Sequence, residues 1–281
     1  MDTSAASVAP VPPSQNVVRR HPLVFYFLLA YGFTGGYALV FYVLLHINLN
    51  LLVLGPPLAA IIMTAAIEGA AGVRRLLGRI VLWRVGVQWY LFAIPGIFVI
   101  SLLGTIVLPG ALASYHAPST GFLLNIPLNF VVSFLIGPLF EEVGWRGFAL
   151  PRMQRLQGPL IGSLLLGLLW AFWHLPLFLV PDFASQNGGL SLASFSMLAL
   201  GAIAISIIMT WVFNNTRGSL LIIMLIHNSV NVSQGVVGSL FPGVNSNPNI
   251  LIGFGVTALV IVLVTRGRLG YQTERSVGTG G

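Results

Sequence analysis

Two adjacent carboxylates, Glu141 and Glu142, end an apolar run that begins near Gly121. Burying an ionised carboxylate in hydrocarbon or in a protein interior is costly, so acids in this position indicate a functional site. Glu142 and Arg146 are four residues apart, which places them on one face of a helix, where they can form an ion pair. Glu141 lies one residue away from that face. The spacing therefore predicts a supporting ion pair beside a second carboxylate that is free for chemistry.

Three further polar side chains interrupt later apolar runs: His174, His227 and Asn231. His227 and Asn231 are four residues apart and project from one face of a helix. At about 1.5 Å per residue, Glu141 and His227 lie roughly 15 Å from the cytoplasmic ends of the apolar runs that contain them. His174 lies roughly 22 Å from the cytoplasmic end of its run. We therefore expect three separate helices to bring these side chains to a common depth.

The chemistry that this set can perform is the activation of water. A carboxylate can take a proton from water as the water attacks a carbonyl carbon. An imidazole and an Asn amide nearby can donate hydrogen bonds to the oxyanion that develops. No Gly-x-Ser-x-Gly elbow and no cysteine is present, so neither a serine elbow nor a cysteine nucleophile is indicated. Three tryptophans near these residues are interpreted as packing or pocket-lining side chains: Trp145, Trp170 and Trp173.

The elements that must position these residues are membrane-spanning helices. With 56% hydrophobic and 7% charged residues, the composition excludes an ordinary soluble domain. We predict an all-α, polytopic transmembrane bundle of eight helices. They are expected over residues 22–47, 49–67, 89–109, 121–150, 159–180, 190–213, 219–240 and 250–265. The fourth run is too long for a simple crossing, so part of it must bend or project from the membrane.

Arginine supplies the whole positive charge, with thirteen Arg and no Lys, and apart from Arg146 these residues follow a pattern. They occur in alternate gaps between the apolar runs and in the two terminal segments. Because basic residues concentrate in cytoplasmic loops, this pattern predicts both termini in the cytoplasm. It also explains the positive net charge without a nucleic-acid partner. Residues 68–87 are expected to form a short amphipathic helix on the cytoplasmic face. Residues 22–268 are predicted to form one membrane domain, with disordered tails at 1–21 and 269–281, and the first tail lacks the order of a signal peptide.

The three polar patterns resemble the motifs of the CAAX protease and bacteriocin-processing (CPBP, or Abi) family. The family includes the Ras-converting CAAX prenyl endopeptidases and bacterial self-immunity proteins. The motifs are E-E-x-x-x-R at Glu141–Arg146, an aromatic-x-x-x-His at Trp170–His174 and H-x-x-x-N at His227–Asn231. The resemblance covers residues 121–234, in the family's order. The family's second motif usually begins with Phe, where this chain has Trp170.

The resemblance implies an eight-span intramembrane glutamic protease whose cavity opens to the cytoplasm. It implies that Glu141 is the general base, assisted by His174, and that His227 and Asn231 form the oxyanion site. Glu142 and Arg146 would support them. The implied substrate is a peptide or prenylated-protein C-terminus, or a bacteriocin-like peptide. The implied location is the bilayer of a bacterial or archaeal cell, or the endoplasmic reticulum of a eukaryote.

Two other readings of the same residues remain open. Two His and two carboxylates suit Zn²⁺, but the spacing does not match H-E-x-x-H, and Arg146 beside the acids opposes a cation. We therefore expect no metal and no other cofactor, with a zinc-dependent membrane hydrolase as the alternative. A proton-coupled transporter or a scaffold is the third reading, because Glu and His chains also relay protons. The sequence shows no obvious pair of broken helices of the transporter kind.

Overall fold

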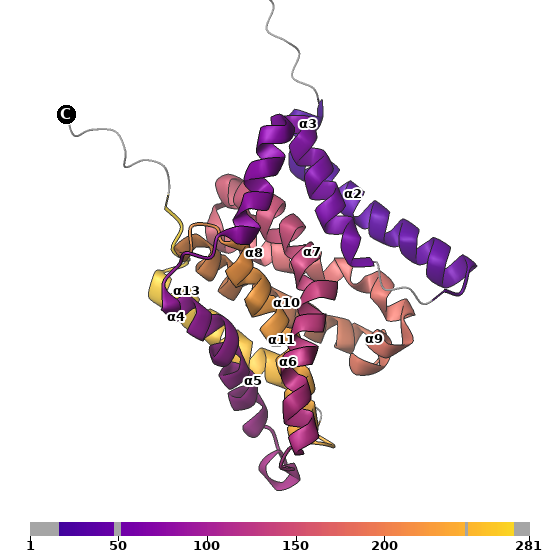
Figure 1. Ribbon diagram of the computed structural model, residues 1–281, viewed down its shortest axis with the longest axis vertical. Helices are drawn as coiled ribbons and strands as arrows, with labels where there is room; N and C mark the ends of the chain where they lie inside the picture. The colour runs from indigo at the N-terminus through magenta and orange to yellow at the C-terminus, as the bar shows by residue number, and fades with distance from the viewer. Residues whose placement is uncertain (1–16, 48–51, 245–246, 273–281) are drawn as a thin grey trace, which may run out of the picture.

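The computed structural model describes residues 17–47, 52–244 and 247–272, and within these ranges every regular element is a helix (Figure 1). Seven helical segments of the described part are long and apolar enough to cross a membrane, and one shorter apolar helix spans residues 120–136. The chain is therefore an integral membrane protein of the all-α class, as predicted. The number of eight crossings and the cytoplasmic position of the termini remain predictions.

The first half of the described chain begins with α1 (Val17–Arg20), so a helical turn occupies the end of the predicted N-terminal tail. The other helices of this half are α2 (Pro22–Tyr37), which continues into the π-helical turn Ala38–Leu44, α3 (Gly55–Gly78), α4 (Val87–Leu91), α5 (Ile97–Ile106) and α6 (Thr120–Ile136). Residues 1–16 of the predicted N-terminal tail and the start of the predicted second span lie outside the described residues.

The second half contains the helices that carry the motifs. They are α7 (Pro138–Glu142), a π-helical segment η6 (Val143–Ala149), α8 (Leu150–Trp173), α9 (Pro181–Gln186), α10 (Leu192–Asn215), α11 (Leu220–Leu240), α12 (Asn247–Ile250) and α13 (Val256–Thr265). Leu269 is buried, and its carbonyl accepts a hydrogen bond from Asn214 at 2.9 Å. The packed structure thus extends past 268, and residues 273–281 of the predicted C-terminal tail lie outside the described residues.

The predicted fourth span, 121–150, is two helices. Helix α6 ends at Ile136, and α7 begins at Pro138 after the non-helical residue Gly137. Pro138 lacks a backbone N–H and disfavours the helical conformation of the residue before it, so it starts a new helix and cannot continue the old one. The bend that the length of this run predicted is therefore present, at Gly137.

The chain continues without a loop from α7 through η6 into α8, across the predicted gap 151–158. A break inside α8 takes the place of that gap: Gly158 has φ 77° and ψ 169° and separates two helical parts. Helix α3 contains a similar break at Gly69 (φ 67°, ψ −167°). Such backbone angles are open to glycine and strained for other residues. After this break, α3 continues as the predicted amphipathic segment, with Leu76 buried and Arg74 exposed.

The Arg-bearing segments between the helices meet at one end of the bundle. The Arg217 guanidinium donates to the Arg84 carbonyl, and the Ser219 hydroxyl donates to the Leu82 carbonyl at 2.7 Å. The Arg152 guanidinium in α8 bonds the Glu68 carboxylate in α3 at 2.7 Å. These contacts join three of the gaps that the sequence marks as basic, which agrees with a common membrane face for them.

The helix that carries the two carboxylates packs closely against the N-terminal helices. In Figure 1, α2 and α3 lie together. The segment η6, which directly follows the two carboxylates, packs against α3. A Cβ atom added to Gly144 of η6 would lie 2.6 Å from both Pro56 Cβ and the Tyr26 hydroxyl oxygen, distances far inside van der Waals contact. Only a residue without a side chain allows this approach.

We therefore expect Gly144→Ala to destabilise the protein by about 1–3 kcal/mol, the usual range for overpacking a close contact. Gly235→Ala in α11 is the matched control, because a Cβ atom there meets nothing within 4 Å. The measurement is the unfolding midpoint of both variants in mild detergent. Equal midpoints would contradict the tight packing of η6 against Pro56 and Tyr26.

Candidate active site

Glu142 lies at the centre of a buried ion-pair cluster. The Arg146 Nη1 atom donates to both carboxylate oxygens of Glu142, at 3.0 and 3.1 Å, as the spacing of four residues predicted. His227 of α11 adds a second partner, with its Nδ1 atom 2.8 Å from Glu142 Oε1. Glu142 and Arg146 are both fully buried. The structure thus joins the first and third motifs through Glu142, a link that the sequence did not reveal.

The π-helical segment η6 positions this pair. All seven of its residues are buried, and it follows directly on Glu142. Gly144 and Gly147 let it approach its neighbours, since a Cβ atom on Gly147 would lie 2.7 Å from Leu76 Cδ1. Single π-helical turns inside α-helices occur frequently at functional sites. Within this segment, Arg146 stays in hydrogen-bond reach of Glu142 while the segment packs on α3.

Trp170 contacts the residues of all three motifs. Its indole Nε1 donates to Glu141 Oε2 at 3.2 Å, and Arg146 Cζ lies 4.6 Å from its ring centroid in a cation–π contact. The ring centroids of His227 and His174 lie 5.1 and 5.4 Å from that of Trp170, both edge to face. The sequence identified Trp170 as a motif residue and as lining, but its role as the common contact depends on the packing of α8.

Glu141 is buried, with 6% of its surface exposed, and it differs from Glu142 in its partners. No arginine or histidine within the described residues forms an ion pair with it, and the indole of Trp170 is its side-chain hydrogen-bond donor. The two adjacent acids are thus unequal, as the sequence predicted. Both oxygens of Glu142 accept from Arg146, and His227 Nδ1 lies near one of them, whereas Glu141 Oε1 has no hydrogen-bond partner among the described residues.

His174 is the C-cap residue directly after α8, and it lies partly buried beside Trp170. Its Nδ1 atom is 2.7 Å from the Trp170 carbonyl oxygen. A carbonyl can only accept a hydrogen bond, so Nδ1 carries a proton, and Nε2 of the neutral ring is an acceptor. Phe183 of α9 stacks on the imidazole with ring centroids 5.9 Å apart. The backbone and an aromatic ring therefore hold this imidazole in one orientation.

Asn231 is not joined to the other site residues by any hydrogen bond in the part of the chain that the structure describes. It lies one turn after His227 on α11, and it is exposed. The fully buried amide is that of Asn228, which donates to the Phe130 carbonyl of α6 at 2.8 Å. Asn228 therefore links α11 to the helix that precedes Gly137. The pattern H-N-S-V-N contains this residue, but helical spacing alone did not single it out.

The other two predicted lining residues belong to the buried core around the cluster. Trp145 is fully buried, with its ring centroid 5.7 Å from that of Trp173. The Trp173 indole donates to the Thr34 hydroxyl at 2.8 Å. Tyr26, which no sequence motif contains, packs edge to face on Trp145, with ring centroids 6.0 Å apart. These contacts tie α2 to the segment that carries the carboxylates.

The donor set around Glu142 fits a cation poorly. Both oxygens of that carboxylate already accept from Arg146, and His227 directs Nδ1 at one of them. Within residues 17–47, 52–244 and 247–272, no group of three or more His, Asp or Glu side chains is arranged to hold a metal ion. Zinc sites need three or four such ligands. The zinc alternative therefore requires a rearranged site and is decided by experiment.

Comparison with known proteins agrees with the motifs. Residues 123–233 match the family described as Type II CAAX prenyl endopeptidase Rce1-like. The CAAX prenyl protease 2 of Methanococcus maripaludis is 30% identical over 149 residues, which cover 50% of this chain and 52% of that relative. The chain thus spans about half the length of the curated relative that it matches. The family resemblance predicted from the three motifs is confirmed, and the matched residues contain all three.

Proposed function

Since residues 123–233 match the Rce1-like family of CAAX prenyl endopeptidases, we propose that this protein is an intramembrane endopeptidase that hydrolyses a peptide bond near the C-terminus of a prenylated polypeptide. Water activated by Glu141 is the nucleophile, in a cavity that opens to the cytoplasm. One observation carries the proposal: Glu141 is buried next to a carboxylate that is already ion-paired, and its own partner is an indole N–H. Such a carboxylate can accept a proton.

In the first step, Glu141 removes a proton from water as the water oxygen attacks the scissile carbonyl carbon. Trp170 holds Oε2, so Oε1 is the oxygen that receives the proton. His174 offers Nε2 as a second acceptor to orient the water, because its Nδ1–H is bound to the Trp170 carbonyl. The carbon–oxygen bond forms, and the carbonyl oxygen becomes an oxyanion.

Donors from α11 stabilise that oxyanion. His227 donates through Nε2 in its imidazolium form, in which the Glu142 carboxylate forms an ion pair with Nδ1–H. Asn231 adds its amide N–H from the next turn of the same face. Preorganised donors of this kind are often the largest single contribution to catalysis of acyl transfer. Glu142 and Arg146 act by holding His227, and they do not touch the substrate.

In the second step, the tetrahedral intermediate collapses and the carbon–nitrogen bond breaks. Glu141, now a carboxylic acid, returns its proton to the leaving nitrogen. The products are a new carboxylic acid and an amine, and Glu141 is ionised again. The new acid then releases its proton to solvent and becomes a carboxylate. No metal or other cofactor takes part in this scheme.

The helix breaks divide on the transporter alternative. Substrate sites of transporters lie at breaks near the middle of the membrane. The breaks at Gly69 and Gly158 lie close in sequence to Arg74 and Arg155, at the basic end of the bundle, whereas the break at Gly137 lies four residues before Glu141. A proton-coupled transporter predicts substrate flux into liposomes that depends on a proton gradient, and we expect none.

We expect the purified protein in detergent to cleave a fluorescence-quenched peptide that carries a prenylated Cys in a C-terminal CAAX sequence. The rate should be the same before and after exhaustive chelation, because the proposed chemistry uses no metal. Loss of cleavage on chelation, restored by Zn²⁺, would establish the zinc alternative instead. The same assay with an unprenylated peptide and with a bacteriocin-like peptide identifies which substrate class is accepted. No cleavage of any of the three would refute the proposal.

A further inference from the structure

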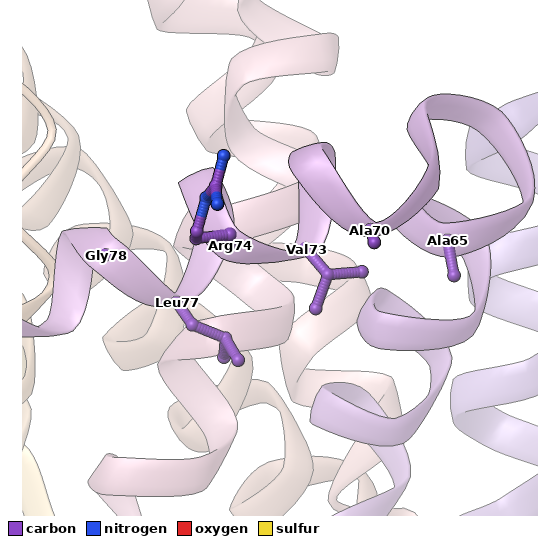
Figure 2. A pocket seen from close by; sticks show the side chains of 6 residues that line it. All are labelled: Ala65, Ala70, Val73, Arg74, Leu77 and Gly78. Carbon is purple, nitrogen blue, oxygen red and sulfur yellow. The ribbon is translucent and has the colours of Figure 1, made fainter.

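A groove of about 660 Å³ lies on α3, and none of the site residues lines it (Figure 2). We call it the α3 groove, and it is lined by Ala65, Ala70, Val73, Arg74, Leu77 and Gly78. Its residues lie on both sides of the break at Gly69, where α3 passes into its amphipathic part. Five of the six lining residues offer only apolar surface. The groove therefore suits a hydrocarbon chain and offers almost nothing to recognise a peptide backbone.

Arg74 is the charged residue of this groove, and it is exposed. Within the described part of the chain, its guanidinium makes no hydrogen bond and no ion pair. Its neighbours differ: Arg75 bonds the Glu68 carboxylate at 2.9 Å, and Arg79 bonds the Gly147 carbonyl at 3.4 Å. Figure 2 shows the Arg74 side chain extending away from those of Val73 and Leu77. The groove thus combines apolar side chains with one unpaired guanidinium group at its edge.

The segment that follows the groove has the character of a membrane surface. Val81, Trp83 and Val87 expose 72%, 60% and 70% of their surface, and Arg84 is exposed among them. Exposed Trp and apolar residues mixed with Arg are typical of the boundary between lipid headgroups and acyl chains. A basic segment at that boundary attracts anionic lipids.

We propose that the α3 groove is a binding site for an anionic phospholipid of the surrounding bilayer. Its acyl chain lies along the apolar floor between Ala65 and Leu77, and its headgroup phosphate pairs with Arg74. The charge complements the unpaired guanidinium, and the amphipathic shape of the lipid matches an apolar groove with a cation at one edge. An isoprenoid chain from a substrate is uncharged and makes no use of Arg74. The proposal does not depend on the peptidase activity.

The test uses the fact that the chain contains no cysteine. An Ala71→Cys variant carries one fluorophore at an exposed position beside the groove, and the full-length protein is placed in nanodiscs. Acyl-brominated phosphatidylglycerol or phosphatidylcholine then quenches the fluorophore when it binds nearby. We expect phosphatidylglycerol to be preferred about fivefold, the factor that corresponds to about 1 kcal/mol for one Arg near an anionic lipid. Salt at about 0.5 M should weaken the preference, because it screens exposed charges.

Arg74→Gln should remove most of that preference. Arg20→Gln is the matched control, because it makes the same change of charge at an exposed position outside the groove, and it should retain the preference. Ala65→Phe, which fills the floor, should reduce quenching by both lipids. Equal quenching by the two lipids in the unmodified background would overturn the proposal, and so would equal losses in Arg74→Gln and Arg20→Gln. Displacement by a prenylated peptide without a headgroup preference would assign the groove to an isoprenoid chain.

Discussion

Replacing Glu141 by Gln is expected to lower kcat for peptide cleavage by about a thousandfold, within the range that a general base contributes. Gln keeps the size of the side chain, and its carbonyl oxygen can still accept the Trp170 indole N–H. It cannot take a proton from water. KM should change little, because Glu141 acts on the water and not on substrate binding. The measurement is the initial rate of cleavage of a quenched prenylated peptide across a range of concentrations.

Glu68→Gln is the control for this prediction. Glu68 is partly exposed and bonds Arg75 and Arg152 at the basic end of the bundle, so its loss removes one negative charge without touching the proposed site. It should retain most of the activity. The unfolding midpoint of Glu141→Gln should lie close to that of the wild type. A Glu141→Gln variant that cleaves at a normal rate would exclude Glu141 as the base.

Replacing Arg146 by Gln is expected to cause the largest loss of stability, about 3–5 kcal/mol, because removing one partner leaves the other charge buried without full compensation. Arg146 and Glu142 are both fully buried, and Arg146 supplies two of the hydrogen bonds of that carboxylate. His227 remains as a partner but is charged only when protonated. The measurement is the free energy of unfolding in mixed micelles.

A double-mutant cycle separates the ion pair from the loss of packing. Glu142→Gln with Arg146→Gln removes both charges, so the double variant should be more stable than Arg146→Gln alone. Arg155→Gln is the control for the loss of one Arg, since that side chain is exposed and bonds a carbonyl of its own helix. If the double variant were less stable than Arg146→Gln by the full cost of Glu142→Gln, the two side chains would be energetically independent.

The sequence alone determined those features that follow from local spacing. Long apolar runs identified the membrane class, since a helix needs about twenty apolar residues to cross hydrocarbon. A spacing of four residues predicted the ion pair of Glu142 and Arg146, because neighbours on one helix face are set by 3.6 residues per turn. The three motifs indicated the family that the chain resembles, and the length of the run 121–150 predicted a bend or a projection from the membrane.

The tertiary structure decided what depends on how separate helices rotate and pack. The helix breaks at Gly69, Gly137 and Gly158 could be located only from the backbone angles of the folded chain. The π-helical turn after Glu142 also changes the direction of each side chain that follows it. Spacing along α11 predicted that His227 and Asn231 share a face. It could not show that His227 meets Glu142 while Asn231 is exposed, because burial on one face varies with the neighbour at each turn.

Trp170 shows the same division between sequence and structure. Its place four residues before His174 is local, and it was identified as part of a motif. Its contacts with Glu141, Arg146 and His227 cross between three segments of the chain. Such contacts depend on the angle of α8 about its own axis, which apolar periodicity constrains poorly in a helix that is apolar on most sides. Sequence therefore named the residues of the candidate site, and packing decided which of them touch.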